Sequence, residues 1–261
     1  SRQMKRIKTA ILLAAAAVAI TACNRKPVVP EFGMLPIDTL LGTQDNGCNI
    51  EYRFATIGNA GKSAALEAIE KANIEYFFEL EEFAGTAREA ADSAILQVAA
   101  EIVLPEGMSQ GMGAYEISVE SEGSVQDTLV TYSIPGGVSL AGHGMYNIEY
   151  HTYSITDGYE LSLADLFTAP QLLGMEKLLR EKLYTQYGTD NDEGLAEQGF
   201  FPEYIALTEN FQITPEGITF YYNPYAIGCY ALGAVEVAIG REELEQFDIR
   251  AERRPGTTGL T

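Results

Sequence analysis

Hydrophobic and polar residues follow two different periods along the first part of this chain. Residues 48–57 alternate at every second position, which is typical of a strand with one buried face. Residues 62–83 carry apolar side chains at every third or fourth position, which predicts a helix. The capping-box sequence from Thr86 to Glu89 predicts the start of a second helix, which Pro105 would end.

Strand-like runs dominate the rest of the chain, and one more helix interrupts them. The leucine spacing over 172–184 predicts that helix. Asp157 and Gly158 form a turn signal that leads into a short strand-like run at 159–163. The remaining strands are predicted at 115–120, 128–134, 145–156, 217–222 and 234–239.

The run 145–156 carries a clear difference between its two faces. Tyr146 and Tyr150 share one face with other apolar residues, and we expect that face to be packed. Glu149 and His151 share the other face, which we expect to meet solvent or to form hydrogen bonds.

Helices that cluster early, followed by antiparallel runs of strands, indicate an α+β fold. We predict an antiparallel sheet with helices packed on one face, in two associated subdomains, 44–155 and 156–249. A proline-punctuated linker at 24–43 precedes them, and a polar, disordered tail at 250–261 follows.

The N-terminal residues 1–23 have the pattern of a lipoprotein signal peptide. A basic stretch precedes an apolar run at 10–19, which is too short to anchor the chain across a bilayer. The run ends in two small residues before Cys23, which resembles the lipobox of bacterial lipoproteins, where the thiol receives a diacylglyceryl group. We expect membrane attachment through this lipid, although an ordinary signal peptide or a buried helix would give a similar run. Asn24 rather than aspartate follows, so we expect the outer membrane rather than the inner, facing the periplasm or the exterior.

Cleavage before Cys23 would make an acidic chain more acidic. It leaves 13 basic and 37 acidic residues, a formal charge of −24. Such a field repels nucleic acid and anionic lipid, and it attracts cationic partners at a rate that salt reduces. We therefore expect no nucleic-acid partner, and either a cationic partner or solubility alone explains the charge.

The two remaining cysteines, Cys48 and Cys229, suggest a disulfide. An even pair in an oxidising compartment favours one, here joining the two ends of the folded part. Two buried free thiols are the alternative.

Candidate catalytic motifs are weak. Ser109 lies in a Gly-x-Ser-x-Gly sequence typical of hydrolases, but the predicted order of helix, loop and strand does not suit a nucleophile elbow. His143 and His151 would lie about 25 Å apart on a strand, so we expect no shared metal. The 37 acidic residues make carboxylate pairs available by chance, so no pair marks a glycosidase site. We predict no metal, no cofactor and no enzyme activity.

The C-terminal third carries a more specific resemblance. Residues 157–167, 211–214 and 217–233 together resemble the RsiV-like domain family, a domain of unknown function. This family is shared by the extracellular lysozyme-binding domain of the anti-sigma factor RsiV and the N-terminal module of a peptidoglycan deacetylase. The resemblance is specific over 156–247 and looser over 45–155. Cys229 stands where the family usually has a small residue, which is consistent with the disulfide.

The resemblance implies a binding role rather than catalysis. The sequence shows neither a sigma-holding segment nor the deacetylase motifs, so we expect neither of those roles to be inherited. What could be inherited is a surface that binds a cationic, lysozyme-like protein or a cell-wall glycan at the envelope. We take Tyr146, Tyr150, Tyr225 and Tyr230 as the candidate binding surface, with an envelope hydrolase as the alternative function. The sequence gives no oligomeric state.

Overall fold

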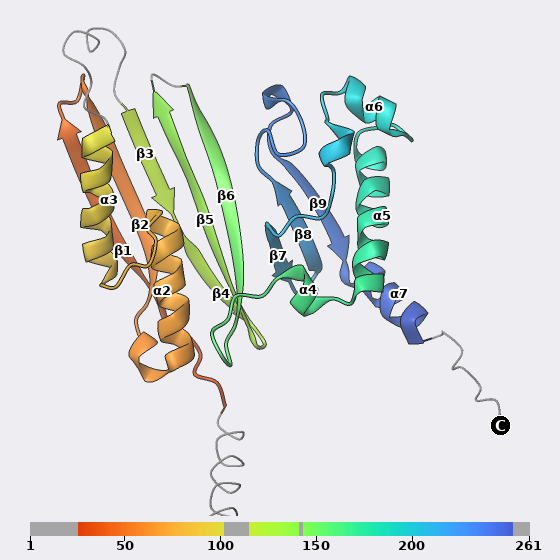
Figure 1. Cartoon of the computed structure of the whole chain (residues 1–261), viewed down its shortest axis with the longest axis horizontal. Helices are drawn as coiled ribbons and strands as arrows, with labels where there is room; N and C mark the ends of the chain where they lie inside the picture. The colour runs from red at the N-terminus through yellow and green to blue at the C-terminus, as the bar shows by residue number, and fades with distance from the viewer. Residues whose placement is uncertain (1–25, 102–114, 141–142, 253–261) are drawn as a thin grey trace, which may run out of the picture.

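The computed structural model describes residues 26–101, 115–140 and 143–252, which form two sheets, each with its own helices (Figure 1). The first part comprises β1 (Phe32–Gly42), β2 (Gly47–Ile57), the 3-10 turn η1 (Ala60–Lys62), α2 (Ala64–Phe78), α3 (Ala87–Glu101), β3 (Tyr115–Glu120), β4 (Glu122–Gln126), β5 (Leu129–Leu140) and β6 (His143–Ser154). The second part comprises α4 (Leu163–Leu166), α5 (Ala169–Gln186), α6 (Asp192–Glu197), η2 (Pro202–Tyr204), β7 (Phe211–Thr214), β8 (Gly217–Tyr222), η3 (Tyr230–Leu232), β9 (Val235–Gly240) and α7 (Arg241–Glu252).

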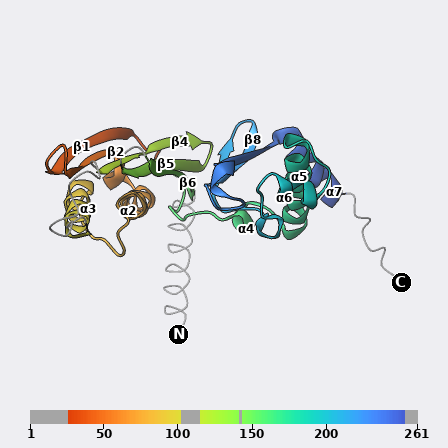
Figure 2. The same ribbon diagram turned by 90° about the horizontal axis from the view of Figure 1, so that it is seen from above.

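The N-terminal sheet is built around β5, which pairs with β3, β4 and β6. All of its pairs are antiparallel except β2 with β3. That pair is parallel because α2 and α3 form the crossover between the two strands, as parallel strands require. Both helices cover the same face of the sheet (Figure 2).

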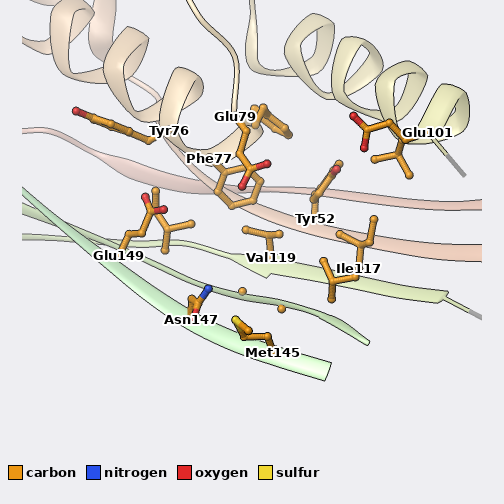
Figure 3. A pocket seen from close by; sticks show the side chains of 16 residues that line it. Tyr52, Tyr76, Phe77, Glu79, Glu101, Ile117, Val119, Met145, Asn147 and Glu149 are labelled. Carbon is orange, nitrogen blue, oxygen red and sulfur yellow. The ribbon is translucent and has the colours of Figure 1, made fainter. Parts of the chain in front are cut away.

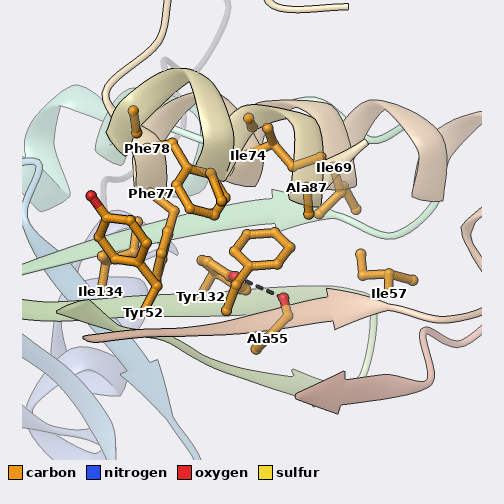
Figure 4. Packing of buried hydrophobic residues seen from close by; sticks show 14 of the residues in the cluster. Tyr52, Ala55, Ile57, Ile69, Ile74, Phe77, Phe78, Ala87, Tyr132 and Ile134 are labelled. Atoms are coloured by element: carbon orange, nitrogen blue, oxygen red, sulfur yellow. Dashed lines mark hydrogen bonds between the residues drawn. The ribbon is translucent and has the colours of Figure 1, made fainter. Parts of the chain in front are cut away.

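Aromatic side chains fill the space between α2 and this sheet. Phe54 of β2 contacts Phe77 and Phe78 of α2, with ring centroids 5.2 and 5.5 Å apart. Behind them, the hydroxyl of Tyr132 donates to the carbonyl of Ala55 at 2.7 Å (Figure 4). These side chains are almost fully buried, and their burial is the main stabilising term for this half of the molecule.

The C-terminal sheet is an antiparallel meander, β7-β8-β9, with its own core. Leu179 and Leu183 of α5, four positions apart on one helix face, are fully buried in the same cluster as Phe220 of β8. Thr168 caps α5 through a complete capping box with Gln171.

Two asparagines connect the two sheets at the edge of β6. The side chain of Asn210 accepts from the Tyr150 backbone N–H at 2.7 Å and donates to the Ile148 carbonyl at 2.8 Å. Asn223 accepts from the Ile148 N–H at 2.8 Å and donates to the same carbonyl at 3.0 Å. These side chains satisfy the strand edge as another strand would, and we call this contact the seam.

The predicted α+β fold with antiparallel sheets and helices on one face is confirmed, and four details differ from prediction. Part of the expected linker, 32–42, forms β1, since it pairs along its whole length with β2. Residues 250–252, expected in a disordered tail, belong to α7. The third difference lies in the strands of the N-terminal sheet, where the β2–β3 pair is parallel and the unpredicted β4 is present.

The fourth difference concerns the cysteines. Both thiols are free, so the predicted disulfide between Cys48 and Cys229 is wrong. A disulfide needs the two Cα atoms within about 7 Å, whereas Cys48 lies fully buried in the N-terminal core and Cys229 beside Gly199 in the C-terminal part.

No helix within the described ranges combines the length and hydropathy that a membrane-spanning helix needs.

Candidate functional site

A hollow of about 440 Å³ lies between the helices α2 and α3 and the N-terminal sheet (Figure 3). We call it the aromatic hollow. Tyr52, Tyr76, Phe77 and Phe78 form its aromatic wall. Its aliphatic lining consists of Val98, Ile117, Val119, Ile134, Val138 and Met145. Binding sites for small molecules and side chains commonly have such an apolar lining with a few polar groups.

Glycines make room for the hollow at the sheet. Gly136 and Gly137 of β5 both line it. A Cβ added at Gly136 would lie 3.3 Å from the Ser118 carbonyl oxygen and from the Val119 side chain, so a larger residue would crowd β3. The sequence therefore keeps β3 and β5 close together while leaving space above them.

The rim of the hollow is acidic. Glu79 follows the last residue of α2, Glu101 ends α3, and Glu149 projects from β6 toward α2 (Figure 3). Glu79 and the burial of the ring raise the pKa of Tyr52 to about 12, with burial the larger cause, so its hydroxyl stays protonated and able to donate.

A second hollow adjoins the first and is more acidic. We call it the acidic hollow. It shares Tyr76, Glu79 and Glu149 with the aromatic hollow. Its other acidic residues are Glu75, Glu81 and Glu82. Within the described residues, Lys71 pairs with Glu75 at 2.5 Å, but no lysine or arginine lies within ion-pair distance of Glu79, Glu81, Glu82 or Glu149. Among the described residues, the shared wall thus carries negative charge that no lysine or arginine neutralises, and His151 alone contacts one of its carboxylates, that of Glu149.

Glu79 occupies a backbone conformation that usually selects glycine. Its φ is 54° and its ψ 45°, the left-handed conformation at the C-terminus of α2. A residue with a Cβ there costs roughly 1 kcal/mol relative to glycine. The same conformation explains why α2 ends at Phe78, although the apolar period continues to residue 83.

His151 lies at the bottom of the shared wall. Its ring stacks on Tyr76 with centroids 3.7 Å apart and planes 14° apart. Nδ1 lies 2.6 Å from Glu160 and Nε2 lies 3.3 Å from Glu149. Burial would lower the pKa of His151, but the hydrogen bonds to Glu149 and Glu160 outweigh burial and raise that pKa above its ordinary value.

Glu160 completes this cluster. It accepts a 2.6 Å hydrogen bond from the hydroxyl of Tyr76 as well as the contact with His151. Burial would raise the pKa of Glu160, but these two partners lower it below the ordinary value. The arrangement holds the His151 ring between two carboxylates, which favour its protonated form, and its hydrogen-bond and stacking partners among the described residues include no serine, threonine or cysteine nucleophile.

The predicted difference between the two faces of 145–156 is wrong for Tyr146, whereas His151 forms hydrogen bonds, which was one of the two expectations for its face. Glu149 and His151 face the helices, and only 12% of the His151 side chain is exposed. Tyr146, expected to be packed, is 56% exposed. The helices cover the face of the sheet on which β6 carries Glu149 and His151. The pairing with β5 fixes this arrangement, because it places His151 opposite the buried Tyr132.

The four tyrosines predicted as a binding surface lie near the seam, in two groups. Tyr150 contacts Tyr221 across the seam, with centroids 5.9 Å apart, and Tyr146 lies on the same face of β6. Tyr225 and Tyr230 contact each other at 5.4 Å, and the Tyr230 hydroxyl donates to the Gly144 carbonyl at 3.1 Å. All four are at least partly exposed, but none of them lines either hollow.

Two other predicted residues, Cys23 and Ser109, lie outside the described residues. Within the described residues, no group of three potential metal ligands gathers at one place. Sequence reasoning missed both hollows. The signal that could have indicated them is the group of three glutamates, Glu79, Glu81 and Glu82, directly after an aromatic helix face.

Comparison with known proteins finds a family of unknown function in the C-terminal part, and the expected RsiV-like link stays a prediction. Residues 164–242 match the family described as a protein of unknown function, DUF3298. A member of this family from Bacteroides fragilis has a similar fold, with a TM-score of 0.71, 23% sequence identity, and coverage of 85% of this chain and 94% of that one.

A DUF3298 family protein from Pseudomonas aeruginosa is also similar, with a TM-score of 0.60, 15% identity, and coverage of 84% and 94% of the two chains. No curated protein matches the chain. The likeness thus extends across both sheets, although at these identities it shows the fold alone. The chain therefore contains a segment that matches the DUF3298 family, and it shares its overall fold with two solved members of that family.

Proposed function

We propose that this protein is a lipid-anchored envelope protein that binds a cationic protein and does not catalyse a reaction. The single observation that carries the proposal is the shared wall of the two hollows, where Glu79 and Glu149 meet Tyr76 and, in the part of the chain that the structure describes, pair with no lysine or arginine. Such a surface favours a positively charged partner, and the formal charge of the whole chain, −20, would steer that partner toward it.

The resemblance of the C-terminal part to the RsiV-like domains supports a protein of the lysozyme type as partner. Lysozyme is cationic and acts at the cell wall, where a lipid-anchored protein would meet it. The anchor itself rests on the sequence around Cys23, and mass spectrometry of the native protein tests it. A diacylglyceryl-modified cysteine is expected there, and an unmodified thiol would contradict the anchor.

Calorimetric titration of the full chain with lysozyme, at low and at high salt, tests the partner. Binding at low salt that weakens at high salt is expected, because exposed charges are screened at high ionic strength. Absence of binding at low salt would remove lysozyme-like proteins as the partner. A cell-wall glycan added in the same assay, without lysozyme, tests the other ligand that the sequence suggests.

A further inference from the structure

We propose that the two hollows bind one basic side chain of a protein partner, a lysine or an arginine. Its aliphatic stem would lie in the aromatic hollow, and its charged head would lie at the wall between Glu79 and Glu149. This inference rests on the proposed function and names the chemistry of its site.

The apolar part of such a side chain matches the aromatic hollow. Lysine and arginine carry three or four methylene groups that pack on apolar surface while the charged head stays near water. The hollow offers aromatic rings from α2 and aliphatic side chains from β3, β5 and β6. Its volume of about 440 Å³ admits a side chain together with an apolar neighbour from the same segment.

The charged head matches the shared wall. Tyr76 is 39% exposed, and one of its faces is covered by His151. The other parts of the ring line both hollows, where a cation over the ring is attracted by its electron density. Glu79 and Glu149 supply carboxylates from opposite sides, one from the end of α2 and one from β6 (Figure 3). A purely anionic or neutral ligand would leave these carboxylates without compensation.

The retention of Glu79 in a left-handed conformation supports a role for its side chain. Glycine would fit the same backbone position at lower cost, so folding alone does not select glutamate. Residues held in sparsely populated conformations occur preferentially at functional sites.

His151 makes the same site sensitive to acid. The groups that face it are Tyr76 from α2, Glu149, Tyr153 and the register neighbour Tyr132 from the sheet, and Glu160 from the segment after β6. A protonated His151 already neutralises part of Glu149, so a basic ligand has to compete with it. When His151 loses its proton, Glu149 becomes fully available.

The test is calorimetry of the full chain with an amphipathic peptide that carries one lysine beside leucines, and with the same peptide carrying glutamine instead. The lysine peptide is expected to bind, and the glutamine peptide to bind about tenfold more weakly, as loss of a hydrogen bond to a charged group predicts. Equal binding of the two peptides would overturn the proposal.

Variants locate the site. Glu149→Gln and Glu79→Gly are each expected to weaken the lysine peptide about tenfold. Glu79→Gly should keep or raise the melting temperature, so its loss of binding would not reflect unfolding. Glu197→Gln, an exposed residue of α6 with the same change in charge as Glu149→Gln, is the control and should bind within about twofold of the original chain. Unchanged binding in both Glu149→Gln and Glu79→Gly would overturn the proposal.

Acidity provides a second readout. The lysine peptide should bind more tightly at about pH 9 than at about pH 6, and His151→Gln should reduce this difference. The lysozyme titration distinguishes failure of the proposed function from failure of the proposed site. If lysozyme binds the variants as well as the original chain, the proposed function stands and this site falls. If the lysine peptide binds as described but lysozyme does not, the site stands and the lysozyme-like partner falls.

Discussion

Two buried tyrosines on neighbouring strands differ in their hydrogen bonds. The Tyr132 hydroxyl contacts the Ala55 carbonyl and the Ser121 hydroxyl, each at 2.7 Å, and Ser121 in turn accepts from the Ala55 N–H. The Tyr153 hydroxyl is equally buried and has no hydrogen-bond partner among the described residues. Burial raises the pKa of both phenols well above the ordinary value, so both stay protonated.

These two tyrosines give a matched pair of substitutions. Tyr132→Phe should destabilise the fold by about 1–3 kcal/mol, because it leaves the buried Ala55 carbonyl and Ser121 without their partner. Tyr153→Phe removes an unpartnered hydroxyl and should be neutral or stabilising. Urea unfolding of both variants measures the difference, and equal losses of stability would contradict the hydrogen-bond assignment.

The His151 cluster predicts a stability that depends on pH. Because the pKa of His151 is raised on folding, its protonation stabilises the folded state. This contribution is fully present at pH values below the unfolded pKa of about 6.5, and it is lost as pH rises through the raised pKa. Because the pKa of Glu160 is lowered on folding, its ionisation also stabilises the folded state. This contribution is fully present at pH values above the unfolded pKa of 4.5, and it is lost as pH falls through the lowered pKa. The cluster therefore stabilises the folded state most between the two unfolded pKa values, 4.5 for Glu160 and 6.5 for His151.

His151→Gln should accordingly cost about 1 kcal/mol near pH 5.5–6.5, a modest figure because Glu160 is partly exposed. The cost should shrink as pH rises through the raised pKa, because His151 then loses its proton in the folded state as well. Thermal unfolding of the variant and the original chain across this range provides the measurement. A cost that is independent of pH would show that His151 acts through packing alone.

At the scale of elements, β1 has the largest consequence for experiments. A chain that begins at residue 44 keeps both predicted subdomains but lacks β1, so the edge of β2 and the side chains that Leu35, Ile37 and Leu41 cover become exposed. Exposed edges pair with other chains. We expect residues 44–261 to be less stable than residues 26–261 and to form oligomers. Size-exclusion chromatography and thermal unfolding of the two fragments test this, and equal behaviour would mean that β1 contributes little.

Elements with a single strong local signal were predictable from the sequence. The capping box at Thr86 begins a helix as expected. The Glu89 N–H donates to the Thr86 hydroxyl, and the Glu89 carboxylate accepts from the Thr86 N–H. The strand at 217–222 has the predicted boundaries. β1 was missed because prolines and the proximity to the predicted signal peptide suggested a linker, although proline is tolerated on an edge strand, where Pro36 lies.

The candidate site depended on information that is not local. Glu149 and His151 are polar and alternate with apolar residues, so the pattern predicted only a face that meets solvent or forms hydrogen bonds. The pairing of β6 with β5 places them under α2 instead, and Tyr76 and Glu160 approach from distant parts of the chain. No single stretch of sequence contains this constellation.

At the scale of the whole molecule, the seam joins two separate cores. Hydrogen bonds from Asn210 and Asn223 to the edge of β6 connect the two parts of the molecule. The two hydrophobic cores themselves form distinct clusters. Replacing both Asn210 and Asn223 by alanine should cost about 1 kcal/mol or more for each and uncouple the two halves. Calorimetric unfolding should then show two transitions in place of one, and hydrogen exchange at Ile148 and Tyr150 should accelerate. A single unchanged transition would show that packing alone couples the halves.

We propose that the two hollows, and not the tyrosines near the seam, form the binding surface. The most direct measurement is NMR of the full chain with labelled tyrosines, titrated with the lysine-containing peptide. We expect chemical-shift changes at Tyr52 and Tyr76, which line the hollows, and none at Tyr225 and Tyr230. Shifts at Tyr225 and Tyr230 with Tyr52 and Tyr76 unchanged would contradict it.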